Sequence, residues 1–148
     1  MTTGGRIWTG AGMGILGATL GYTAMLAGRT DLSHLLLALP EIFLIMLLSA
    51  GPGALVLSVL HASLMGRWAP RASSRGQIRI VGILLGMFLG VANLIVSFEA
   101  LLLAWGGGHR TNVYSPQMAL LLIPAVAGGA GAGWGVTLGL NPGLPEDR

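Results

Sequence analysis

Cysteine and lysine are both absent from this chain of 148 residues, and charged residues of any kind are scarce. Without cysteine, the chain has no disulfide, no thiolate ligand for a metal and no thiol nucleophile. Aspartate, glutamate, lysine and arginine make up 9% of the residues, whereas soluble domains carry about 25%. We therefore expect lipid, and not water, to surround most of the chain.

Recognisable catalytic motifs are missing as well. The sequence has no P-loop, zinc-protease helix or nucleophile elbow. Ser58 and His61 are three residues apart, but no third group is placed to orient them as a hydrolase requires. The isoelectric point near 10.7 does not indicate nucleic-acid binding, because four of the eight arginines lie in one short segment. We predict a protein that is not an enzyme and binds neither a metal nor nucleic acid.

Long apolar stretches are what the sequence has in abundance. Hydrophobic residues make up 53% of the chain, and its mean hydropathy is +0.77. A bilayer is crossed by about 20 mostly apolar residues, and the stretches 7–27, 35–65, 80–105 and 118–140 satisfy this requirement. We predict an all-α polytopic membrane protein, with residues 1–148 forming a single transmembrane domain of four helices in an up-down bundle.

Arginines determine the expected orientation. We interpret residues 66–79 as a loop between the second and third spans, and positively charged loops of this kind stay in the cytoplasm. With four spans, the N- and C-termini then lie in the cytoplasm too. The lack of lysine beside abundant glycine and alanine is typical of a GC-rich genome. We expect the membrane to be a bacterial inner membrane. The arginines of the loop are Arg67, Arg71, Arg75 and Arg79.

Glycines recur at helical spacing in three of the four spans and share one face in each. In lipid, small residues let two helix backbones approach closely and gain van der Waals contact. A glycine-rich composition explains their number but not their alignment, so we predict that they form helix–helix contacts. The predicted packing residues are Gly10, Gly14, Gly17 and Gly21 in the first span, Gly82, Gly86 and Gly90 in the third, and Gly131, Gly135 and Gly139 in the fourth.

The second span is too long to cross a bilayer as one straight helix, and it contains prolines at positions 40 and 52. Proline removes a backbone donor and frees the carbonyl one turn earlier. We predict that this helix is kinked or broken at Pro52, within Gly51-Pro52-Gly53. Antiparallel pairing with the third span would put Asn93 at the same depth, and we expect its amide to bond to the freed carbonyls.

Three ionisable residues fall within or at the edge of these spans. Glu41 follows Pro40, and we expect it to cap the start of a helix. We interpret His61 as a packing residue, with ligation of a tetrapyrrole as the alternative, and we predict no other cofactor. Glu99 lies about 140° from the glycine stripe of the third span. That helix then needs protein on two opposite faces, unless the carboxyl group is protonated or reaches the interface.

Two functions fit these features. The first is a non-catalytic integral membrane subunit that packs within a larger membrane protein complex and stabilises it, such as an energy-converting or photosynthetic one, with other membrane subunits and lipids as partners. The alternative is a small proton- or ion-coupled transporter or channel, in which Glu41 and Glu99 line a path beside the broken helix at Gly51-Pro52-Gly53.

Overall fold

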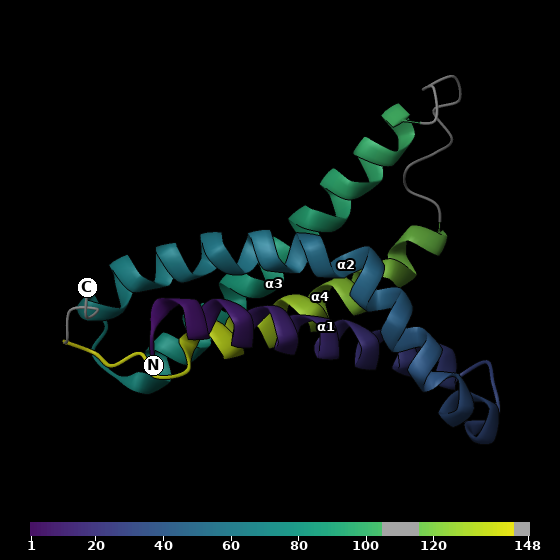
Figure 1. The fold of residues 1–148 in the computed structure, drawn as a ribbon, viewed down its shortest axis with the longest axis horizontal. Coiled ribbons are helices and arrows are strands. Elements are labelled where there is room, and N and C mark those ends of the chain that lie inside the picture. Colours follow the sequence, from purple (N-terminus) through teal and green to yellow (C-terminus); the bar gives the residue numbers. More distant parts are fainter. Residues whose placement is uncertain (105–115, 144–148) are drawn as a thin grey trace.

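The computed structural model describes the backbone of residues 1–104 and 116–143, and their side chains except those of 49, 50, 97–104 and 116–119. Over this part of the chain every regular element is a helix, so the predicted all-α class is confirmed. Consecutive long helices alternate in direction (Figure 1). The helices are α1 (Thr3–Ala27), α2 (Leu32–Trp68), the short 3₁₀ helix η1 (Ala69–Arg71), α3 (Arg75–Ala104) and α4 (Pro116–Thr137).

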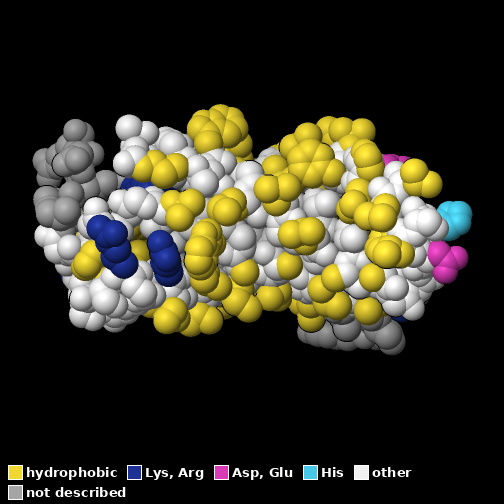
Figure 2. Space-filling model, turned by 90° about the horizontal axis from the view of Figure 1, so that it is seen from below, with side chains coloured by type: hydrophobic (Ala, Val, Ile, Leu, Met, Phe, Trp, Pro, Cys, Tyr) yellow, Lys and Arg dark blue, Asp and Glu magenta, His cyan; other side chains and the backbone are white. Residues whose placement is uncertain are grey.

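Several helices have the length and composition of membrane spans. Thr3–Ala27, Arg75–Val96 and Leu120–Thr137 are each long and apolar enough to cross a bilayer, and the bent helix α2 makes a fourth if its two segments form one span. Figure 2 shows charged side chains gathered at the two ends of the long axis, with hydrophobic side chains spread between them. These properties agree with a helical membrane protein of three or four spans.

Helix α1 begins earlier than hydropathy predicts because a polar side chain caps it. The Thr2 hydroxyl oxygen accepts a hydrogen bond from the Gly5 backbone N–H at 3.2 Å, which satisfies one of the free donors of the first turn. Arg6, which precedes the predicted span 7–27, lies inside the helix and is only 1% exposed. Its Nη2 donates to the Thr3 hydroxyl at 3.4 Å.

A capping arrangement also starts α3, so the loop predicted at 66–79 is wrong in its limits. The Gln77 backbone N–H donates to the Ser74 hydroxyl at 3.1 Å, and the Gln77 side-chain oxygen accepts from the Ser73 backbone N–H at 2.8 Å. These bonds satisfy backbone donors at the start of the helix and so stabilise its N-terminus. Only residues 72–74 connect η1 to α3. The four arginines consequently lie in the flanking helices and not in a long loop.

Helix α2 changes direction shortly before Pro52. Its segments Leu32–Leu48 and Gly51–Arg71 are inclined by 58° to each other. The physical reason is that Pro52 has no N–H to donate to the carbonyl of Leu48, four residues earlier, and its ring presses against that turn. Glu41 lies nine residues after the first residue of α2 and is exposed, so it does not cap a helix start as expected.

Helix α4 lies between α1 and α3 and packs against both. It ends at Thr137, and Gly139 follows with a φ of +79°, a left-handed conformation that glycine adopts without strain. The expectation that Gly139 continues the helical stripe is therefore wrong. A buried cluster fills the end of the bundle where α2 meets α3; its members are Ala62, Met65, Ala69, Ala72, Ile78 and Val136.

Candidate functional site

One face of α4 meets the glycine stripe of α1 almost without intervening side chains. A methyl group added at Gly17 would overlap the Ala127 carbonyl oxygen, and one added at Gly14 would lie 3.2 Å from the Ala132 methyl. Gly10 is buried against the Val136 side chain of α4, and Gly21 is buried against Ala127 and Pro124. From the side of α4, Gly131 lies against the Met13 carbonyl and Gly135 against the Gly10 backbone, and Gly128 faces Ala18.

The opposite face of α4 meets the glycine stripe of α3. Methyl groups added at Gly86 and Gly90 would overlap the carbonyl oxygens of Gly129 and Ala125 respectively. Gly82 lies against Thr137 and the Gly133 carbonyl. The α4 side of this contact is formed by Gly129 and Gly133, two glycines that were not among the predicted packing residues. Both helix pairs are therefore joined backbone to backbone, with α4 in the middle.

Asn93 of α3 lies directly against the proline-containing segment of α2. A methyl group added at Gly53 would be 3.0 Å from the Asn93 side-chain nitrogen and 3.1 Å from its oxygen. The amide thus contacts the residue next to Pro52, in the neighbourhood where the bend frees carbonyl groups. Asn93 and Gly53 are therefore in contact in the structure, although they are 40 positions apart in the sequence.

His61 and Ser58 lie on the buried side of α2 and are 1% and 0% exposed. The His61 imidazole lies close to the backbone of Gly82 in α3. Its Nε2 atom has no hydrogen-bond partner among the described residues, and the same holds for the Ser58 hydroxyl oxygen.

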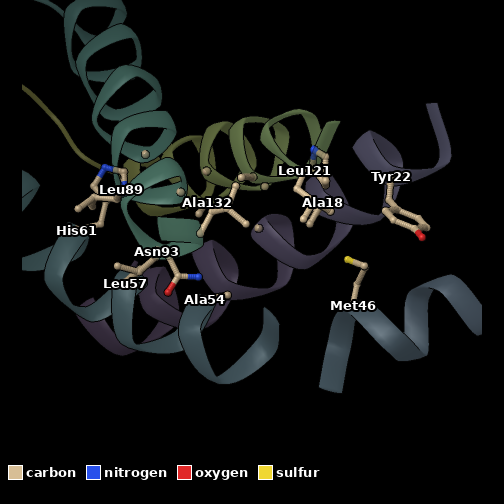
Figure 3. A pocket seen from close by; sticks show the side chains of 18 residues that line it. Ala18, Tyr22, Met46, Ala54, Leu57, His61, Leu89, Asn93, Leu121 and Ala132 are labelled. Atoms are coloured by element: carbon tan, nitrogen blue, oxygen red, sulfur yellow. The ribbon is translucent and has the colours of Figure 1, made fainter. Parts of the chain in front are cut away.

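A cavity of about 250 Å³ lies between α1, α2, α3 and α4. Figure 3 shows His61 and Leu57 at one end of it, Tyr22 and Met46 at the other, and Asn93 between them. Along α4 it extends from Ala132 to Leu121, which is about 16 Å at roughly 1.5 Å per residue. The remaining lining is apolar or glycine: Gly14, Ala18, Ala54, Gly86, Leu89, Gly90, Leu94, Pro124, Ala125, Gly128 and Gly129.

The other predicted residues lie away from this cavity. Glu41 is exposed on α2 and does not line it. Arg67, Arg71, Arg75 and Arg79 are all exposed at the end of the bundle that holds η1. The Arg79 guanidinium lies 5.2 Å from the centre of the Trp134 ring, a cation–π contact that links α3 to α4. Glu99 belongs to α3, but its side chain is outside the described residues.

Sequence reasoning missed Tyr22, Met46 and Leu57 as members of one site. They are ordinary apolar or aromatic residues at helical spacing, and nothing in their pattern separates a cavity from a packed core. The unpartnered Nε2 of His61 was also unpredictable, because its burial depends on which helices surround α2.

Comparisons of the chain with protein-family models, with curated proteins and with solved structures each found no match.

Proposed function

We propose that this protein is a non-catalytic integral membrane subunit that packs against other membrane proteins and stabilises their complex, for example an energy-converting or photosynthetic one. The observation that carries this proposal is the exposed face of α3. Phe88 and Ile95 lie on this face and are 71% and 52% exposed. The glycine stripe of the same helix is turned the other way, against α4.

Lipid covers phenylalanine and isoleucine well, but the sequence continues this face to Glu99, four positions after Ile95. A carboxylate surrounded by hydrocarbon is destabilising by about 2.5–3.5 kcal/mol on insertion scales. In Figure 1 the outer part of α3 projects away from α1, α2 and α4. A partner that offers Glu99 a hydrogen-bond donor removes this penalty, which supports the subunit proposal.

The proposal includes a location and an orientation. The chain crosses a bacterial inner membrane with four helices, and its N- and C-termini lie in the cytoplasm with η1. Support comes from the exposed arginines of α2, η1 and α3, because positive residues gather on the cytoplasmic side. Met1 lies beside Gly139, close to where α4 ends, so the first and last helices share this end of the bundle.

The alternative, a proton or ion path through Glu41 and Glu99, has less support. Such a path requires carboxylates that face a shared polar space beside the bend of α2. Glu41 is exposed and does not line the cavity, whose polar groups come from His61, Asn93 and Tyr22.

Purification of the tagged full chain in mild detergent from its native membrane separates the two functions. The subunit proposal predicts a partner membrane protein at a fixed ratio, retained through two independent affinity steps. A homo-oligomer that carries protons into liposomes, and stops doing so when Glu99→Gln is introduced, would establish the transporter instead. A visible spectrum of the same sample tests for a tetrapyrrole bound at His61.

A further inference from the structure

We propose that the arginines around η1 bind an anionic phospholipid, with its phosphate group between Arg75 and Arg79 and its acyl chains along the exposed side of α3. The inference rests on the membrane location proposed above. It is independent of the proposed protein partner, because every residue of the site belongs to this chain.

The end of the bundle that holds η1 carries a concentrated positive charge. Its four exposed arginines form what we call the arginine patch: Arg67, Arg71, Arg75 and Arg79. No ion pair joins any of them to another residue in the part of the chain that the structure describes. The described acidic residues, Asp31 and Glu41, lie toward the opposite end, where Figure 2 shows magenta side chains. Described residues therefore do not balance the charge of the patch, which attracts an anion.

Arg75 and Arg79 are placed to bind one phosphate together. They are one helical turn apart on α3, so their side chains begin about 5–6 Å from each other. The Arg79 guanidinium lies 5.2 Å from the centre of the Trp134 ring, which restricts its position. A guanidinium has several N–H donors, and a contact with one ring leaves most of them available to phosphate oxygens, which they bind in pairs.

The surroundings of the patch favour a lipid over an acidic protein. Tryptophan prefers the headgroup level of a bilayer. Trp8 and Trp134 are 68% and 39% exposed, and they lie in the turns of α1 and α4 near this end. Ile80 and Leu84 follow Arg79 on α3 and are 61% and 59% exposed. A lipid whose phosphate is bound at Arg79 covers this apolar surface with its acyl chains, whereas an acidic protein segment in the cytoplasm leaves it uncovered.

Fluorescence quenching in nanodiscs tests this site on the purified full chain. Trp134 is made the single tryptophan by Trp8→Phe, Trp68→Phe and Trp105→Phe. Phosphatidylcholine nanodiscs then receive phosphatidylglycerol or more phosphatidylcholine, each with brominated acyl chains that quench tryptophan on contact. Half-maximal quenching by the anionic lipid is expected at a mole fraction about 25-fold lower, because each of two arginines contributes about fivefold near an anionic headgroup.

A matched pair of variants assigns this preference to the patch. Arg75→Gln leaves the contact between Arg79 and Trp134 in place and should reduce the preference for phosphatidylglycerol about fivefold. Arg29→Gln removes the same charge from an exposed position at the opposite end and should leave the preference unchanged.

Three results would overturn the proposal: equal quenching by the two lipids, an unchanged preference in folded Arg75→Gln, or a preference that inorganic phosphate abolishes at constant ionic strength. The last result would assign the patch to a free anion. An acidic protein held by the patch in the native membrane, without lipid preference in nanodiscs, would replace the lipid with a protein. If the single-tryptophan variant does not fold, paramagnetic resonance decides the question on the unmodified chain by comparing immobilised spin-labelled phosphatidylglycerol with phosphatidylcholine.

Discussion

At Gly86 there is no room for a side chain, because the Gly129 carbonyl oxygen lies where a methyl group would be. The same is true at Gly17 and Gly90, so single hydrogen atoms set the distance between α4 and its two neighbours. Glycine is unfavourable in a helix by about 1 kcal/mol relative to alanine. Its repeated use here is explained by the close approach that it permits.

Gly86→Ala should lower the free energy of unfolding by about 1–3 kcal/mol, because the nearest atoms are backbone and cannot rotate away. Gly12→Ala is the matched control, since an added methyl there has no atom within 4 Å. This control should change stability by less than about 1 kcal/mol, or raise it. Unfolding in mixed micelles with increasing dodecyl sulfate measures both variants, and equal effects would refute the packing role of Gly86.

A polar residue at the bend gives a second prediction at this scale. If Asn93 bonds to carbonyls freed by Pro52, Asn93→Leu should destabilise the protein by about 1–2 kcal/mol. The loss should be much smaller when Pro52→Ala is also present, because alanine restores the backbone donor. A double-mutant cycle of the two changes measures this coupling. A coupling energy of zero would mean that Asn93 contacts Gly53 without supporting the bend.

At the scale of the helix, the shape of α2 is the main feature to test. This helix bends between Met46 and Ala54, two residues that line the cavity. The absence of cysteine makes this shape measurable, because spin labels can be attached at introduced cysteines alone. Leu37 and Leu64 are both exposed and lie on opposite sides of the bend.

Pro52→Ala should lengthen the distance between spin labels at Leu37→Cys and Leu64→Cys by about 5 Å. The two arms are each about 20 Å long at roughly 1.5 Å per residue, and the present angle between them is 58°. Pulsed electron paramagnetic resonance in nanodiscs measures the distance. The same labels with Pro40→Ala provide a control, because Pro40 lies outside this bend and that substitution should change the distance less. An unchanged distance in Pro52→Ala would assign the bend to tertiary packing instead.

The sequence predicted the presence of the helices more accurately than it predicted where they end or which helices they pack against. Hydropathy found the apolar cores of all four long helices, and helical periodicity placed Gly10 and Gly86 on shared faces. A hydropathy window does not respond to polar caps, so the starts at Thr3 and Arg75 were predicted too late. The cavity depends on how four helices meet, and periodicity gives the face of each helix but not its neighbour. Gly129 and Gly133 were missed for that reason.

At the scale of the whole molecule, charge and apolar surface are separated along the long axis (Figure 2). The end with η1 holds the exposed arginines, and the other end holds the connection between α1 and α2, with Arg29, Asp31 and His34. This asymmetry between the ends is the basis of the proposed orientation.

A single cysteine at each end tests that orientation. Thr30→Cys should react with a membrane-impermeant maleimide added to intact spheroplasts, because the connection between α1 and α2 is proposed to face outward. Ser74→Cys should react only after the membrane is permeabilised. Both positions are exposed in the structure, so a difference in labelling reports the side of the membrane and not burial. The reverse pattern would place the arginines outside.

Site-specific photo-crosslinking on α3 tests the central claim, a protein partner on the outer part of that helix, most directly. A benzophenone amino acid at Val96, which is 66% exposed, is compared in the native membrane with the same group at Leu84, which is 59% exposed on the same helix. The subunit proposal predicts one cross-linked protein of constant mass from Val96 and only lipid adducts from Leu84. Lipid adducts alone from both positions would contradict it.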